Sequence, residues 1–171
     1  MITEDGCRKM ARYNAWQNDN LYDAAAGLGD AARRAPRGAF FGSIHATLNH
    51  ILWADLMWLS RFGHGEAPAG GIAGSVSLVP DWEALCAARR EADAMIVDWA
   101  DAVTGADLAG QMVWYSAAVG QEMSRPQALC VMHMFNHQTH HRGQVHAMLT
   151  AAGATPGPTD LAFASADLLG G

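Results

Sequence analysis

The chain has 171 residues, half of them apolar, which is enough for one domain with a packed core. Its formal net charge is −6, and its 11 Lys and Arg residues form no run. This composition argues against nucleic acid and against an anionic membrane surface as partners, because both need a basic face. We therefore expect a single domain over residues 1–171 with neither nucleic acid nor a membrane as its partner.

The three cysteines, Cys7, Cys86 and Cys130, are widely spaced, and no CxxC pair occurs. This pattern is typical of a reduced protein and not of a disulfide framework. The first residues, MITEDGCRKMARYNAW, carry acidic side chains early and lack the apolar segment of a signal peptide. No apolar run approaches the length of a membrane span. The sequence thus predicts a cytoplasmic protein.

Glycine and proline divide the chain into segments with helical spacing. The first helix is expected over 3–27, with Thr3 as its cap. The stretch 28–39 has the composition of a loop. A second helix is expected over 41–62. The glycine-rich connection that follows, 63–77, is too flexible for the interior of an element, but it is long enough for a crossover.

A third helix is predicted over 80–103, with Pro80 in its first turn. The stretch 104–124 is ambiguous. Val113, Trp114 and Tyr115 favour a strand, so a short hairpin-like segment is expected near 111–119.

The fourth helix is predicted over 125–152, capped by Ser124, with Pro126 in its first turn and Gly153 at its end. The tail is expected to be loop with one short helical turn. Four long helices with short strands at most indicate an all-α fold, an antiparallel four-helix bundle.

The stretch HMFNHQTHHRGQVH, residues 133–146, holds five of the eight histidines. It could be a metal site, an acid–base site or a polar helix face. On a helix, His137 and His141 are neighbours, as are His133 and His137. The apolar residues of this predicted helix form one arc of its surface. His141 lies at the edge of this apolar arc with His137 beside it, whereas His133 and His140 lie further toward the polar side. We therefore expect His137 and His141 to open into the core. The residues that define the apolar arc are Cys130, Met134, Val145, Met148 and Leu149.

Two imidazoles do not complete a metal site, because catalytic zinc usually has three protein ligands and one open position. Another helix must supply the third ligand. His45 and His50 in the second predicted helix are candidates, and His64 in the glycine-rich connection is a weaker one. Helical periodicity alone does not decide between His45 and His50. The alternative for each is a core histidine with an ordinary hydrogen bond.

One motif is absent. An HExxH zinc protease needs a glutamate as general base, but Gln138 follows His137 here, and an amide cannot take up a proton. The sequence therefore argues against a protease of that class.

Other residues near the cluster have expected roles as well. Metal-bound histidines usually donate their second ring N–H to a partner, and Asp55 or Gln144 could be that partner. His140 is expected to support the ligands or to lie on the surface, and His133 and His146 are expected to be structural.

The sequence also suggests roles for three further residues of the fourth predicted helix. Arg142 could bind an anionic substrate group or pair with an acid on a neighbouring helix. Gly143 suggests close helix packing, since glycine costs about 1 kcal/mol relative to alanine inside a helix. Cys130 is expected to be a buried, inert thiol.

These motifs resemble the DinB superfamily of DinB/YfiT-like proteins. The similarity is strongest in FNHQTHHRGQVHAML at 135–149. It continues in ATLNHILWADLMWLSRF at 46–62, and more loosely in ARYNAW at 11–16. The resemblance implies a four-helix bundle that holds a divalent metal through three histidines, one from the second helix and two from the fourth. Carried onto this sequence, the ligands are His50, His137 and His141.

The resemblance also implies a homodimer and a zinc or nickel ion. Some relatives are thiol transferases or isomerases that use a low-molecular-weight thiol. We therefore expect a metal-dependent enzyme that acts on a small-molecule substrate, a thiol S-transferase or a hydrolase, whose catalytic residues the sequence does not identify. The alternative is a non-enzymatic, stress-related protein that binds a metal or another ligand.

Overall fold

The computed structural model describes residues 1–169, which fold into a mostly helical structure with one small two-stranded sheet. No helix in this range is both long and apolar enough to cross a membrane. The four long helices are α1 (Glu4–Ala26), α3 (Ile44–Arg61), α4 (Trp82–Ala102) and α6 (Gln127–Ala151). The short elements are α2 (Asp30–Arg34), η1 (Ile72–Ser77), α5 (Gly105–Ala109), β1 (Gln111–Ser116), β2 (Gln121–Pro126), η2 (Leu161–Phe163) and α7 (Ala166–Leu169).

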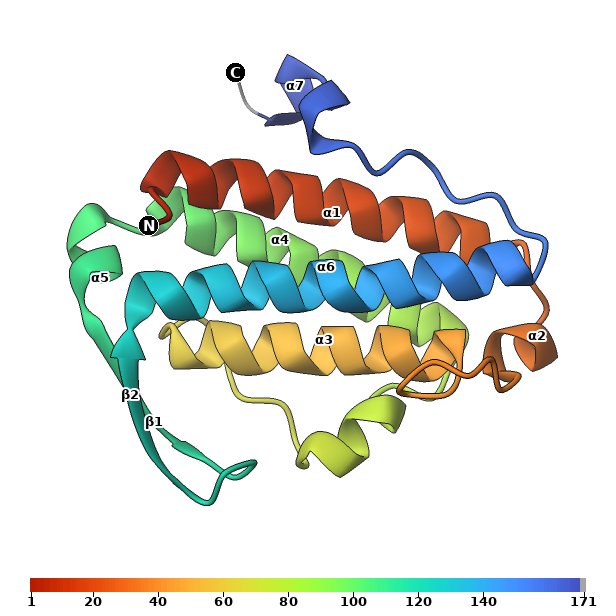
Figure 1. Ribbon diagram of the computed structural model, residues 1–171, viewed down its shortest axis with the longest axis horizontal. Coiled ribbons are helices and arrows are strands. Elements are labelled where there is room, and N and C mark those ends of the chain that lie inside the picture. Colours follow the sequence, from red (N-terminus) through yellow and green to blue (C-terminus); the bar gives the residue numbers. More distant parts are fainter. Residues whose placement is uncertain (170–171) are drawn as a thin grey trace.

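The four long helices lie side by side (Figure 1). Helices α1 and α6 run in one direction, and α3 and α4 run in the other. A contact between helix ends agrees with this, because the backbone N–H of Gly105, just after α4, donates to Glu4 at the start of α1. Neighbours α1 and α4 are thus antiparallel, as are α3 and α6, whereas α3 and α4 are parallel. The parallel pair requires the connection 62–81 to cross the length of the molecule.

Side-chain caps set where three of the long helices begin. Thr3, Ser43 and Asp81 each accept a hydrogen bond from the backbone N–H three residues further on. The second predicted helix therefore begins at Ile44 and not at residue 41. Pro80 precedes the cap of α4, so its expected place in the first turn was wrong.

Two stretches expected to be loop contain short helices. Helix α2 lies within 28–39, and the 3-10 helix η1 lies within 63–77. In η1, the Ser75 hydroxyl donates to the Ile72 carbonyl at 2.6 Å and fixes the turn.

The segment near 111–119 does form a hairpin, in which β1 pairs antiparallel with β2 and Gln111 lies opposite Pro126. The second strand extends further than expected and contains Ser124, so Ser124 does not cap α6. Helix α6 instead begins after Pro126 with no side-chain cap. Gly153, with a φ of 83°, follows its end as predicted.

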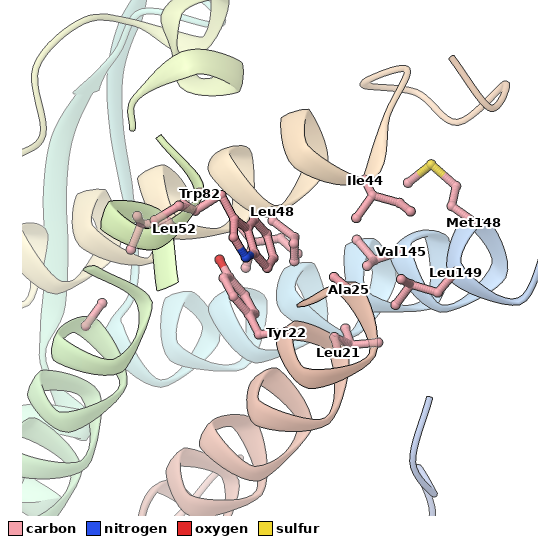
Figure 2. Packing of buried hydrophobic residues seen from close by; sticks show 13 residues of the cluster. Leu21, Tyr22, Ala25, Ile44, Leu48, Leu52, Trp82, Val145, Met148 and Leu149 are labelled. Atoms are coloured by element: carbon pink, nitrogen blue, oxygen red, sulfur yellow. The ribbon is translucent and has the colours of Figure 1, made fainter. Parts of the chain in front are cut away.

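Two apolar clusters fill the space between the long helices. Figure 2 shows the first, where Tyr22 and Trp82 stack with ring centroids 5.6 Å apart and Leu48 and Leu52 lie beside them. The second cluster lies toward the opposite end of the helices. Its members include Cys7, Leu59, Ile96, Trp99, Val131 and Phe135.

A buried polar layer separates the two clusters. Arg89 of α4 lies 2.6 Å from Asp55 of α3 and 2.9 Å from Asp93. Asp55 also accepts from Gln138 of α6 at 2.8 Å, and Asp93 accepts from Asn18 of α1 at 2.8 Å. Each long helix contributes to this layer. Sliding one helix by a turn would leave a buried charge or amide unpaired, so the layer fixes the register of the helices.

Candidate metal centre

Three histidines from two helices meet at one point beside the polar layer. His50 comes from α3, and His137 and His141 come from successive turns of α6. One ring nitrogen of each lies within 4.8 Å of the others. The Nε2 atoms of His50 and His137 are 3.1 Å apart. Two nitrogens that are each about 2.0 Å from a tetrahedral ion are about 3.3 Å apart, so this spacing suits a shared metal.

The hydrogen bonds of Ser75 fix the orientation of His50. The Ser75 hydroxyl uses its proton on the Ile72 carbonyl, so its oxygen accepts at 2.9 Å from Nδ1 of His50. The proton of neutral His50 therefore sits on Nδ1, and Nε2 keeps a free lone pair directed at the other histidines.

His141 is held in the same way. Its Nδ1 lies 2.9 Å from Oε1 of Gln144, one turn further along α6. An amide oxygen can only accept, so Nδ1 carries the proton and Nε2 is unprotonated. Gln144 is one of the two partners that the sequence suggested. The other, Asp55, binds Arg89 and Gln138 instead, and within the described residues it makes no hydrogen bond to the three histidines.

Nδ1 of His137 is buried and has no hydrogen-bond partner within the described residues. Leaving a ring nitrogen in this state costs free energy. The Nε2 of the same ring faces the Nε2 of His50. His137 therefore offers Nε2 as its ligand atom, and its Nδ1 is the one ring nitrogen of this kind in the group that no described residue pairs.

Burial keeps all three imidazoles neutral at physiological pH. It lowers the pKa of His50 to about 4, with a further contribution from the nearby His141. It lowers the pKa of His137 to about 3, and the surrounding histidines add to this effect. The pKa of His141 is lowered as well, again mainly by burial. Metals bind the neutral form of histidine, so the group is in its ligand state.

Aromatic side chains enclose the group. The Phe41 ring stacks on His50 with centroids 3.8 Å apart and lies 5.2 Å from His141. Phe41 stands in the turn before α3, where Gly42 adopts a φ of 82°. This positive φ bends the chain so that Phe41 covers the histidines and exposed Phe40 does not.

A family model for the DinB family matches residues 1–167. The chain belongs to the DinB family. It is 24% identical to Protein DinB of Bacillus subtilis (strain 168) over 156 residues, which cover 89% of each chain. Its fold is similar to the crystal structure of a DinB-like protein from Bacillus cereus ATCC 10987, with a TM-score of 0.62 and 20% identity. That match covers 84% of this chain and 90% of the other.

The other histidines of this DinB chain lie outside the group. His45, the alternative on α3, points toward Arg34 and Asn49. His133 contacts the Trp58 ring, 5.1 Å between centroids, and its own ring is 5.9 Å from that of His137. His140 packs edge-on against His141 and lies 3.3 Å from Gln144. His64 and His146 do not belong to the group of three either.

Two expectations for α6 need correction. Arg142 is buried but donates to the amide oxygen of Asn14 on α1, so its partner is an amide and not an acid. A side chain added at Gly143 would meet nothing within 4 Å, so close helix packing does not explain this glycine within the described structure. Cys130 is buried as expected, and burial raises its thiol pKa.

Sequence reasoning missed Phe41 and Ser75. Phe41 was placed inside the second predicted helix, and Ser75 lies in the connection where no periodicity applies. The available signal for Phe41 was Gly42 before Ser43, since a glycine followed by a serine cap indicates a turn that ends just before a helix.

Proposed function

We propose that this DinB family chain binds a divalent metal ion, zinc or nickel, through His50, His137 and His141. The observation that carries the proposal is the convergence of three neutral imidazoles from two helices. In two of them the other ring nitrogen donates to a protein partner, which leaves Nε2 free for a metal. The DinB family membership supports the same reading.

Three neutral ligands would leave the full charge on the ion, which supplies Lewis acidity and lowers the pKa of a water or thiol beside it. The protein's part is to hold the imidazoles in place and to shape the space next to them. A pocket of about 410 Å³ opens beside His50 and His137. Trp53, Trp58 and Trp114 line it, so it can bind an apolar group while excluding most of the water.

We propose that the protein is an enzyme of the thiol S-transferase or hydrolase type, with a small-molecule substrate in this pocket. His50 and His137 can be reached from this pocket. Such access supports an enzyme, because a purely structural metal site is closed to solvent and to ligands. A low-molecular-weight thiol is a candidate second substrate.

The second candidate is a non-enzymatic protein that binds a metal or a ligand. One observation favours it. Among the described residues that line the pocket there is no Asp or Glu, so no carboxylate stands ready as a general base. Neutral His133 is the only other titratable imidazole there, and burial lowers its pKa.

We further interpret the four long helices as a four-helix bundle in a single domain, and propose that the protein is a cytoplasmic homodimer. The net charge of −6 supports a small molecule over nucleic acid as the partner.

Metal analysis tests the first part. The protein should be purified without a nickel column, and its metal content measured by mass spectrometry beside three variants. We expect about one divalent ion per chain, lost in His50→Ala and in His137→Ala. His146→Ala is the matched control, because it removes an imidazole of α6 that is not in the group, and it should keep the ion. Absence of metal after reconstitution with zinc and with nickel would refute the metal proposal.

The enzyme proposal needs a separate assay. The metal-loaded protein should be screened against electrophiles and esters, with and without thiols. Turnover that disappears in His137→Ala supports the enzyme. A stable metal complex with no turnover across the panel favours the binding protein.

A further inference from the structure

Arg61 stands in the wall of the pocket beside the histidines, at the C-terminal end of α3. The same pocket has His50 and His137 in its wall, so one cavity joins the arginine to the candidate metal centre. Trp58 of α3 and Trp114 of β1 lie next to Arg61. The hairpin thus brings an aromatic ring to the arginine from a segment distant in sequence.

Two indole rings hold the guanidinium group. Its central carbon is 4.6 Å from the Trp58 ring centroid and 5.5 Å from that of Trp114. The two indoles meet edge to face, with centroids 5.7 Å apart. Both distances are within the range of cation–π attraction, which restricts the guanidinium group without occupying its N–H edge.

Arg61 has no anionic partner among the side chains that the structure describes. No described carboxylate lies within 4.0 Å of it, and it donates no hydrogen bond to a described residue. Other arginines, such as Arg12, Arg34 and Arg89, do pair with acids. Arg61 is half-buried, and the surrounding protein disfavours its charge through desolvation. In a chain of net charge −6, a half-buried cation left unpaired in a cavity is conspicuous.

The pocket therefore combines three properties. Its walls are aromatic, it contains no acidic residue among the described lining, and its one cation presents a planar fork of N–H donors. A carboxylate fits such a fork with two parallel hydrogen bonds, and the indoles suit an apolar body attached to it.

We propose that Arg61 determines the specificity of this pocket, which takes a small molecule that joins an apolar, preferably aromatic, body to a carboxylate. The carboxylate binds Arg61, the body lies against Trp58 and Trp114, and the remaining end faces His50 and His137. The direction of the reactive end rests on the proposed function. The contact with Arg61 does not, because it needs no metal.

The test compares two probes of nearly equal shape, 2-naphthylacetate and 2-naphthylacetamide. Their binding to the metal-free protein is followed by NMR, using the tryptophan indole N–H signals. Metal-free protein is essential, because a carboxylate could otherwise bind an ion directly. We expect the acid to bind at least about ten-fold more tightly than the amide, as a charge-assisted hydrogen bond to Arg61 implies.

In Arg61→Gln, the preference for the acid should fall to less than about two-fold, while the amide affinity stays nearly the same. Arg61→Lys keeps the charge but loses the fork, so its preference should lie between those of the other two proteins. Arg90→Gln is the matched control, because it removes an exposed positive charge of α4 that does not line the pocket, and its preference should equal that of the unmodified protein.

Equal binding of acid and amide to the unmodified protein would overturn the proposal. So would an acid preference that persists in both Arg61 variants, or no binding of the acid at millimolar concentration. Metal content measured on Arg61→Gln separates this result from the metal question. Arg61 is not one of the three histidines, so this variant should keep the ion and lose the acid preference, and failure of one proposal does not imply failure of the other.

Discussion

Replacing Asp55 with alanine tests the polar layer that joins the two helices of the candidate metal centre. The Asp55 carboxylate is fully buried, 2.6 Å from Arg89 and 2.8 Å from the amide nitrogen of Gln138. Removing one partner of a buried ion pair costs about 3–5 kcal/mol. Arg89 keeps Asp93 at 2.9 Å, which lowers this cost, but the Gln138 side chain loses the one hydrogen bond it makes within the described residues, which adds about 1 kcal/mol or more. We expect Asp55→Ala to lower the free energy of unfolding by about 4 kcal/mol.

Urea unfolding of the metal-free protein, followed by circular dichroism, measures this loss. Asp55→Asn keeps an oxygen that can accept from Gln138, so its loss should be smaller. Asp98→Ala is the matched control, because it removes an exposed carboxylate of α4 and should change stability by less than about 0.5 kcal/mol. A loss below about 1 kcal/mol in Asp55→Ala would refute the reasoning, because it would mean that the helices do not depend on this layer.

The same variant should weaken metal binding. His50 is five residues before Asp55 on α3, and His137 is next to Gln138 on α6. The contact between Asp55 and Gln138 is therefore the polar link between the two helices nearest to the three histidines. Helices that lose this link hold the imidazoles less firmly, and the metal affinity measured by competition with a chelator should fall.

Three further predictions concern single residues. Because burial holds the pKa of His137 near 3, only the unfolded chain takes up a proton as the pH falls from about 6.5 toward that value. His137 alone should contribute up to about 1.4 kcal/mol per pH unit to the loss of stability of the metal-free protein there, measured by urea unfolding, and a His137→Gln profile that is equally steep would contradict this. Gly143→Ala should raise stability by about 0.5–1 kcal/mol, because its site is open and helical, whereas Gly153→Ala should lower it, because φ there is 83°. Ser75→Ala should weaken metal affinity about 10–100-fold by freeing His50, and an equal loss in exposed Ser77→Ala would argue against that role.

The long helices could be predicted from the sequence because their signals are local. Apolar residues at helical spacing marked the four segments, and Thr3 and Gly153 marked an end of α1 and of α6. The errors came where two local rules competed. Ser124 before a proline has the pattern of a helix cap, but cross-strand pairing with β1 places it in β2. Tertiary contacts overrode the local preference there.

The site was predictable only in part. The spacing of His137 and His141 on one helix selected that pair, but periodicity left His45 and His50 open, because both face buried surroundings. The resemblance to DinB proteins pointed to His50, and the structure brings His50 together with the pair. No local rule could supply Ser75 or Arg61, since each acquires its role from a contact with a residue far along the chain.

The crossover between α3 and α4 has a consequence for the time at which the centre forms during synthesis. His50 and His137 are separated by 87 residues, and the hairpin lies between them. A nascent chain that has just completed β2 already contains His50 and Ser75, but it has neither histidine of α6. Single imidazoles hold metal ions weakly, so such a chain cannot trap an ion in a partial site. We therefore expect the three imidazoles to come together in one step, when α6 docks between α1 and α3, so that a metal ion would meet the complete histidine group.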